Sequence, residues 1–369
     1  MSRRIVAGEE VEYVGSGFSR ISFSRTVAFA LVIAVVALAT APLAGQSSGK
    51  APAVNVVKPV VPGVNVVKKT PWGDPDLQGV YTFSTLTPLQ RPDALAAKVA
   101  LTEAELAELE ERDAQNRVAE DRPLAPGNPG TYNNFWTSNE KGRRTGRSSL
   151  IVNPPDGRRP PLTPQAQERR DQLTSEAAAR RVGTPPFDHV IYRSWKDLPA
   201  YTQCVSRPMP RQSQAYNHGL QILQVPGYVV IHYESMHDVR FIPLDGRPHL
   251  PGNIRLWNGD SRGHWEGNSL VVDWTNFDPR QEYEGAPQGN MHFVERFTRV
   301  DAKTINYEVT VDDKTTWTKS WKFLLPWRAD DGNYQKPEDL YEYACHEGNY
   351  RQMEDALSGS RAVENTAAK

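Results

Sequence analysis

The feature that most constrains the fold is a series of short strand-like segments that begins near residue 200. In most of these segments Val, Ile, Tyr, Phe and Trp alternate with polar residues, and Gly, Asp, Asn and Pro lie between the segments. The segments are 221–223, 228–234, 239–243, 254–257, 270–275, 292–299, 304–311, 317–325 and 340–345. Their connections are too short for parallel crossovers, so they predict an antiparallel meander. A sheet of that many strands usually curls, so we expect a mainly β fold, a barrel or strongly curved sheet, with two or three peripheral helices.

Composition divides the 369-residue chain into five parts. Basic residues precede the apolar run from Val27 to Leu38 and small residues follow it, as in a secretory signal peptide. An uncleaved N-terminal anchor is the alternative. The predicted parts are a signal peptide (1–44), a disordered linker (45–70), strands and helices packing on the barrel (71–199), the meander (200–355) and a disordered tail (356–369). We therefore expect a periplasmic or secreted protein.

Two helices are expected in the N-terminal half. Thr102 and Glu105 form a capping box at the start of a helix over residues 101–119. Thr163 and Pro164 open a second helix that runs to about residue 181, with proline at the first helical position. The first helix is rich in Glu, which predicts a solvated surface helix.

Overall charge limits the class of partner. The formal net charge is −1, and no basic run is interleaved with aromatic residues, so neither nucleic acid nor an anionic membrane surface is expected as a partner. Nine Trp and fourteen Tyr favour strands and an aromatic-lined interior. The expected partner is a small-molecule ligand or substrate, and the oligomeric state does not follow from the sequence.

The chain contains two cysteines, Cys204 and Cys345. In an exported chain an even pair predicts one disulfide bond. The alternative is a free thiol nucleophile at Cys345 beside His346 and Glu347. Such an arrangement is uncommon, because a nucleophile and its base are seldom neighbours in sequence.

Histidines are concentrated in the meander. Six of the eight lie within 75 positions, at residues 218, 232, 237, 249, 264 and 292. A histidine and a carboxylate could act as general base and acid, with Arg240 or Arg262 holding an oxygen-rich substrate. Alternatively, several histidines with Glu or Asp could bind a divalent metal, although no HExxH or comparable signature is present. The third possibility is that they are ordinary surface and turn residues.

Polar residues also interrupt apolar strand faces. Glu295 lies between Phe293 and Phe297 on one face of the segment 292–299. A carboxylate in such a place is either paired or has a raised pKa. Lys319 shares a predicted strand face with Trp317 and Trp321, which makes it a candidate partner for Glu295 or a cation packed on indole rings.

The segment 263–277 predicts a β-hairpin. Gly267-Asn268 suits a two-residue turn, and an alternating strand follows it. His264 and Glu266 are two positions apart, so a strand places them on the same face. This pair is a candidate catalytic edge or a hydrated one, and Trp265 and Trp274 are expected to build the wall of a cavity.

Four motifs carry a resemblance. PWGDPDLQG at 71–79, SLIVNPPDG at 149–157 with PPLTP at 160–164, GHWEG at 263–267 and YACHE at 343–347 together resemble a large family of exported bacterial proteins, over roughly residues 70–355. The resemblance implies no activity and carries over no catalytic residue. The meander also looks like lipocalin-type barrels, which is an analogy of architecture alone.

Two functional hypotheses follow. The first is an exported enzyme of hydrolase or lyase type that acts on a small oxygen-rich or aromatic molecule; signatures of nucleotide cofactors and of α/β-hydrolases are missing. Its candidate catalytic residues are His218, Glu234, His237, Arg240, His264, Glu266 and Glu295. The second is a non-catalytic periplasmic binding protein with an aromatic-lined pocket. The candidate substrate-binding residues are Trp257, Arg262, Trp265, Trp274, Trp317, Lys319 and Trp321. No cofactor is predicted, although a divalent metal is possible.

Overall fold

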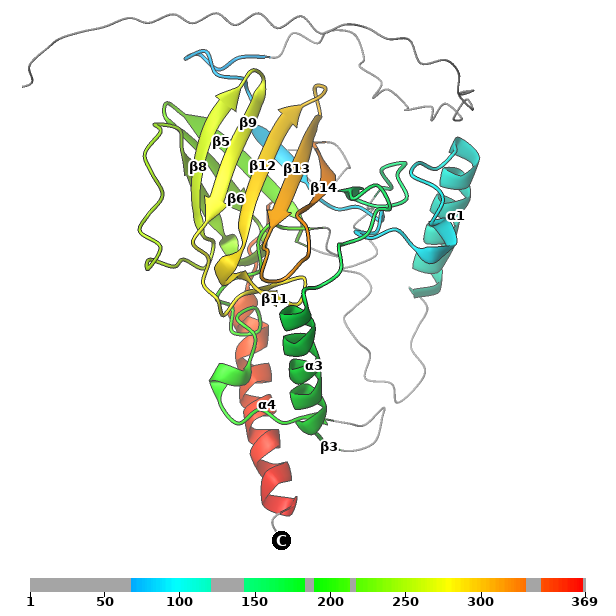
Figure 1. Ribbon diagram of the computed structural model, residues 1–369, viewed down its shortest axis with the longest axis vertical. Helices are drawn as coiled ribbons and strands as arrows, with labels where there is room; N and C mark the ends of the chain where they lie inside the picture. The colour runs from blue at the N-terminus through cyan, green and yellow to red at the C-terminus, as the bar shows by residue number, and fades with distance from the viewer. Residues whose placement is uncertain (1–67, 121–142, 183–188, 213–216, 330–339, 368–369) are drawn as a thin grey trace, which may run out of the picture. The chain divides into compact units, whose positions relative to one another are not determined.

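The predicted meander forms one ten-stranded antiparallel sheet in the computed structural model (Figure 1). The structure describes residues 68–120, 143–182, 189–212, 217–329 and 340–367. The strands of this sheet are β1 (Gly79–Thr82), β2 (Ile151–Asn153), β5 (Gly219–Val225), β6 (Tyr228–Tyr233), β7 (Val239–Pro243), β8 (Asp260–Glu266), β9 (Ser269–Thr275), β12 (His292–Arg299), β13 (Thr304–Asp312) and β14 (Trp321–Arg328). The expected export segment and most of the linker lie outside the described residues.

The strand order is β7-β6-β5-β1-β14-β13-β12-β9-β8, and β2 also pairs with β14. Strands joined by short connections pair with each other, as in β5–β6–β7, β8–β9 and β12–β13–β14, whereas the long connection from β7 to β8 joins the two edges of the sheet. β1 comes from the N-terminal half and inserts between β5 and β14, so this half contributes strands to the sheet itself. The prediction of a mainly β fold with a strongly curved antiparallel sheet is confirmed.

Alternation along each strand divides the sheet into a buried inner face and an outer face. On β12, Phe293, Glu295 and Phe297 are buried while the residues between them are partly exposed. The largest inward side chains come from β9, β13 and β14 as well, and they make the inner face a continuous aromatic core. Two of them, Tyr307 and Trp327, have ring centroids 4.4 Å apart.

The edges of the curved sheet, β7 and β8, approach each other through side chains. No backbone ladder joins these two strands in the described part of the chain. A Cβ atom added to Gly263 on β8 would lie 2.7 Å from Ile242 Cγ2 on β7. Arg240 on β7 donates a 2.9 Å hydrogen bond to Ser261 Oγ on β8. Gly263, the first glycine of the GHWEG motif, therefore allows the two edges to pack closely.

The β8–β9 hairpin matches its sequence signal. Glu266 pairs with Ser269 across the two-residue turn, and Gly267 has φ 60°, a conformation that glycine adopts without strain. The predicted hairpin register is therefore set locally.

The other regular elements among the described residues are two shorter hairpins and three α-helices. The hairpins pair β3 (Arg181–Val182) with β4 (His189–Val190), and β10 (Glu282–Tyr283) with β11 (Ala286–Pro287). The helices are α1 (Glu103–Glu120), α3 (Pro164–Ala179) and α4 (Cys345–Ala367), and single 3₁₀ turns lie at Asp93–Leu95, Trp195–Asp197, Ser235–His237 and Gln288–Asn290.

The first two helices begin where the sequence predicts. Thr102 Oγ1 accepts a hydrogen bond from Glu105 N while Glu105 accepts one from Thr102 N, which is the expected capping box. At α3, Thr163 Oγ1 accepts from Ala166 N and Pro164 occupies the first helical position. Both signals are local in sequence, so tertiary contacts are not needed to produce them.

Two segments differ from the expectation. Residues 254–257 form no strand, and only Leu256 makes an isolated bridge, to Phe277. Residues 340–344 also lie outside any strand, and α4 continues to Ala367, through most of the segment 356–369 that we expected to be a disordered tail. Within the described residues, the segment 340–345 pairs with no strand. The disulfide bond between Cys345 and Cys204 links its end to the segment before β5 instead. None of the described helices is both long and apolar enough to cross a membrane.

Candidate functional site

The predicted catalytic residues fall into three separate places. Arg240 and Glu295 lie inside the curved sheet, His218, Glu234 and His237 lie at one end of it, and His264 and Glu266 lie on its outer face. Each place has its own hydrogen-bond network, so we describe them in turn.

Inside the sheet, the partner of Glu295 is Arg240. Arg240 donates to Glu295 Oε1 at 3.0 Å and to Oε2 at 2.7 Å, and Tyr307 donates a further hydrogen bond to the same carboxylate. The side chains of Arg240 and Glu295 are 2% and 0% exposed. Lys319, the predicted partner, is exposed, because β14 begins only at Trp321 and the alternation does not extend back to residue 319.

This buried pair is packed on aromatic rings. The Arg240 guanidinium lies 3.4 Å from the ring centroid of Trp274. Burial, the largest single effect, would lower the pKa of Arg240, but the charge and hydrogen bonds of Glu295 together with the neighbouring Tyr233 and Tyr307 outweigh it and hold the pKa above its usual value. Burial raises the pKa of Tyr307, and the neighbouring carboxylate raises it further. Both groups therefore keep their usual charge states in the core.

The end of the sheet near β5 and β6 holds the second group. His218 Nδ1 is hydrogen-bonded to Thr82 Oγ1 at 2.6 Å, and Glu234 accepts from Gly219 N at 3.1 Å. In the β6–β7 turn, Met236 and His237 have positive φ values of 64° and 51°, which non-glycine residues seldom adopt. Burial lowers the pKa of the neighbouring His232, and the nearby His237 lowers it further.

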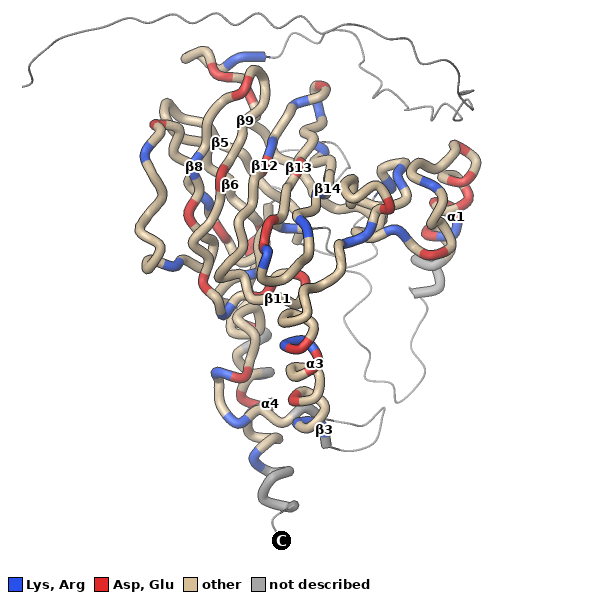
Figure 2. The backbone as a smooth tube through the Cα atoms, viewed as in Figure 1, with Lys and Arg blue, Asp and Glu red and all other residues tan. Residues whose placement is uncertain are grey.

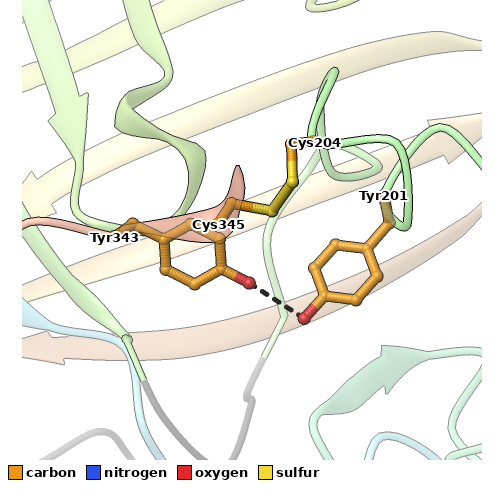
Figure 3. The surroundings of a disulfide bond; sticks show 4 residues. All are labelled: Tyr201, Cys204, Tyr343 and Cys345. Carbon is orange, nitrogen blue, oxygen red and sulfur yellow. Dashed lines mark hydrogen bonds between the residues drawn. A yellow bond between two sulfur atoms is a disulfide. The ribbon is translucent and has the colours of Figure 1, made fainter. Parts of the chain in front are cut away.

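The disulfide bond lies next to this end. Cys204 and Cys345 are joined as predicted, and Tyr201 and Tyr343 beside them are hydrogen-bonded through their hydroxyl groups at 2.9 Å (Figure 3). Tyr343 N also donates to His237 Nε2 at 3.2 Å. A small pocket of about 280 Å³ is lined by residues from the β6–β7 turn, the disulfide and the start of α4.

On the outer face, His264 and Glu266 form an exposed pair. His264 Nε2 lies 3.1 Å from Glu266 Oε1, and the two side chains are 59% and 49% exposed. Arg296 donates to the other oxygen of Glu266 at 2.6 Å. The hydrogen bond from Arg296, followed by that from His264, lowers the pKa of Glu266. The pair follows the predicted same-face geometry, but it lies on the solvated side of the sheet.

A second histidine network lies on the same face. His249 Nδ1 and Nε2 lie 2.8 Å from Asp260 Oδ2 and 2.7 Å from Asp273 Oδ1, and His292 Nε2 lies 2.8 Å from Asp273 Oδ2. The hydrogen bond between His292 and Asp273 lowers the pKa of the Asp273 carboxyl and raises the pKa of the His292 imidazole. Arg262, predicted to hold substrate, donates to Asp260 at 2.6 Å instead. This network ties the β7–β8 connection to the sheet.

The predicted aromatic residues mostly build the core. Trp274, Trp317 and Trp321 are at most 2% exposed. Trp265 is partly buried against the core, and Trp257 stacks on the Arg280 guanidinium with its ring centroid 4.4 Å away. Within the described residues, no group of three or more His, Cys, Asp and Glu side chains is arranged to hold a metal ion.

A different region provides a cleft of about 660 Å³. Its described lining is mostly apolar, with three arginines and one glutamate among the polar groups. The apolar lining comprises Pro160, Pro161, Leu162, Pro164, Ala166, Leu173, Ala286, Pro287 and Trp317, and the polar lining comprises Gln90, Arg159, Gln167, Arg169, Arg170, Glu284 and Thr316, with Gly285. We call this the 159–173 cleft.

Three chain segments, 159–173, 284–287 and 316–317, line most of the 159–173 cleft, and Gln90 comes from a fourth. Thr163 N donates to Thr316 O at 2.9 Å and Thr318 N donates to Pro161 O at 3.0 Å, so the segment before α3 pairs with the segment before β14. The first turns of α3 form one wall. The β10–β11 hairpin forms another, with its tip at Glu284 and Gly285 in the left-handed conformation. Of the predicted site residues, Trp317 alone lines this cleft among the described residues.

Sequence reasoning missed most of this cleft. The PPLTP motif at 160–164 predicts the start of a helix and carries part of a resemblance, and Trp317 is a candidate substrate-binding residue, but neither pattern indicates a cleft between them. The proline-rich run before a helix with adjacent arginines was the available local signal. Its meeting with the 284–287 hairpin depends on the tertiary structure.

Comparisons with known proteins do not assign the chain to a family. No family model matches the chain, and no curated protein matches it. Among solved structures, a mutant of the fluorescent protein UnaG is similar, with 13% identity over 35% of this chain and 84% of that chain and a TM-score of 0.19. A similarity at that level carries no argument about fold or function.

Proposed function

We propose that this protein is a small-molecule binding protein, exported from the cytoplasm, whose ligand occupies the 159–173 cleft. The observation that carries the proposal is the cleft itself. Its volume of about 660 Å³ lies within the usual range for ligand sites, about 300–1,000 Å³. An apolar floor that includes Trp317, with a few polar groups around it, is the usual composition of such a site.

Binding is favoured over acid–base catalysis by where the titratable groups lie. General acid–base chemistry needs a histidine or carboxylate within hydrogen-bond reach of the bound substrate. The described lining of the 159–173 cleft contains no histidine, and its one carboxylate, Glu284, is paired with Arg159 at 2.6 Å. The histidine–carboxylate pairs lie on the outer face of the sheet instead. The enzyme hypothesis therefore has less support.

Export is supported by the signal-like run from Val27 to Leu38 and by the disulfide bond. Disulfide bonds persist in oxidising compartments and are rare in the cytosol.

Binding can be tested with a cleft variant and a matched control. Leu173 lines the cleft and is 44% exposed, so Leu173→Asp is expected to leave the fold intact while placing a charge on the apolar wall. Leu223 on β5 is 42% exposed and does not line the cleft, so Leu223→Asp serves as the control. Calorimetric titration with a panel of small amphipathic compounds should find binders whose affinity falls about tenfold or more in the cleft variant alone.

Two outcomes would contradict the proposal. One is a panel without any binder to the wild-type protein. The other is a binder whose affinity is the same in wild type and Leu173→Asp, because that ligand would occupy another place.

A further inference from the structure

The described lining of the cleft has more positive than negative side chains, with three arginines and one glutamate. Arg159 is already neutralised, because its Nη1 donates to Glu284 Oε2 at 2.6 Å and to Glu284 O at 3.2 Å. Arg169 Nη2 donates to the backbone oxygen of Thr315 at 3.1 Å, and Arg170 Nη2 donates to Gln167 Oε1 at 2.6 Å. Both of these acceptors are uncharged. The polar contacts of Arg169 and Arg170 therefore satisfy hydrogen bonds without cancelling charge.

The nearest carboxylate compensates only weakly. Asp171 Oδ1 lies 4.0 Å from Arg170 Nε, at the limit of an ion pair, and the same oxygen accepts from Gln167 Nε2 at 2.7 Å. Figure 2 shows basic and acidic positions close together along the backbone of α3. Among the described residues, Arg169 has no carboxylate within ion-pair distance. Both arginines extend from the second turn of α3. This wall of the cleft therefore attracts anions.

The floor restricts which anion fits. Trp317 is 2% exposed and forms a β-bridge with Leu162, and both residues line the cleft together with the buried Ala286. A highly charged sugar phosphate would leave polar groups unpaired on such a surface. An apolar body is favoured there by burial. The Arg159–Glu284 pair shows that a carboxylate is accommodated at the cleft by guanidinium groups.

We propose that the ligand of the 159–173 cleft is an amphipathic monoanion: an aromatic or acyl body on the floor and one carboxylate held by Arg169 and Arg170. This inference rests on the proposed binding function and specifies its ligand class. The guanidinium groups supply charge-assisted hydrogen bonds, which are stronger than those to a neutral ligand. A cation with the same body would be repelled.

The test uses three probes with one apolar body. The full-length protein is titrated with 2-naphthoate, 2-naphthalenemethanol and 2-naphthylmethylammonium, at low salt and again with added sodium chloride. Naphthoate should bind about tenfold more tightly than the alcohol, and the ammonium most weakly. Added salt should reduce the preference, because the arginines are solvent-accessible.

A paired variant identifies the residues. Arg169→Gln with Arg170→Gln should abolish the preference for naphthoate while leaving binding of the alcohol within about twofold. The control is Arg112→Gln on α1, because Arg112 is 58% exposed, close to the 57% of Arg170, and does not line the cleft. It should leave all three affinities unchanged.

The outcomes separate this inference from the function it rests on. Equal binding of the three probes, or a naphthoate preference that survives the double substitution, would overturn the ligand class while binding at the cleft stands. Failure of all three probes while a neutral or cationic compound of the panel binds at the cleft would do the same. Failure of all three together with a panel that contains no binder would overturn both.

Discussion

Replacing Glu295 with glutamine tests whether the charge pair inside the sheet is essential for stability. The substitution keeps the shape of the side chain but leaves the Arg240 guanidinium, 2% exposed, without its counter-charge. Two hydrogen bonds of 3.0 and 2.7 Å from Arg240, and a third from Tyr307, would lose a charged acceptor. Breaking a buried pair from one side costs about 3–5 kcal/mol of the free energy of unfolding. We therefore expect Glu295→Gln to lower it by that amount.

The assay is equilibrium unfolding in urea, with a matched exposed pair as control. Glu308 on β13 accepts from Lys322 at 2.9 Å, and these side chains are 33% and 38% exposed. Because exposed pairs contribute about 0–1 kcal/mol, Glu308→Gln should change the free energy of unfolding by no more than that. Both substitutions alter a strand glutamate bound to a cation, so the difference between them measures the effect of burial.

A double substitution completes the test. Arg240→Met combined with Glu295→Met removes both charges and fills the space with apolar atoms, so it should destabilise much less than the sum of the two single changes. Tyr307 and Ser261 would each lose a partner, which leaves a remaining cost of about 1–3 kcal/mol for each. A cost below about 1 kcal/mol for Glu295→Gln, or single effects that simply add, would refute this reasoning.

Two further predictions concern the outer face and the seam between the sheet edges. The raised pKa of His292 contributes stability that is fully present below the ordinary histidine value of about 6.5 and is lost as the pH rises through the raised value. The lowered pKa of Asp273 contributes stability that is fully present above about 3.9 and is lost as the pH falls through the lowered value. The free energies of unfolding of wild type and Asp273→Asn should therefore differ most between these two pH values and less on either side, and a difference that is independent of pH would contradict this. Gly263→Ala should lower the free energy of unfolding by about 1–3 kcal/mol because its Cβ would lie 2.7 Å from Ile242, whereas Gly252→Ala, with open space around it, should not, and equal effects would exclude close packing at the seam.

Local patterns in the sequence determined much of the fold. Alternation along 292–299 placed Glu295 on the buried face, because successive strand residues point to opposite sides. The capping box at Thr102, the Thr163 cap and the Gly267 turn were also readable, because each involves residues only a few positions apart. The pairing of the two cysteines followed from their number and from the expected compartment.

Pairing across the sheet was decided only by the tertiary structure. Lys319 was the partner that the sequence suggested for Glu295, but the curvature that brings β7 across from β12 selected Arg240, 55 positions from Glu295 in the sequence. His264 and Glu266, predicted as a catalytic edge or a hydrated one, are 59% and 49% exposed on the outer face. No local pattern states how far a sheet curls or which of its edges meet.

The 159–173 cleft shows most clearly which features local sequence patterns determine and which depend on the tertiary structure. The sequence by itself determined its parts: a proline-rich run before a capped helix, two adjacent arginines on that helix, and a strand-like face that contains Trp317. Only the tertiary structure brought the hairpin tip at Glu284 to Arg159, 125 positions earlier in the chain. Strand and helix signals depend on residues that are close together in sequence. A cleft depends on contacts between distant segments, and no local pattern in either segment indicates that contact.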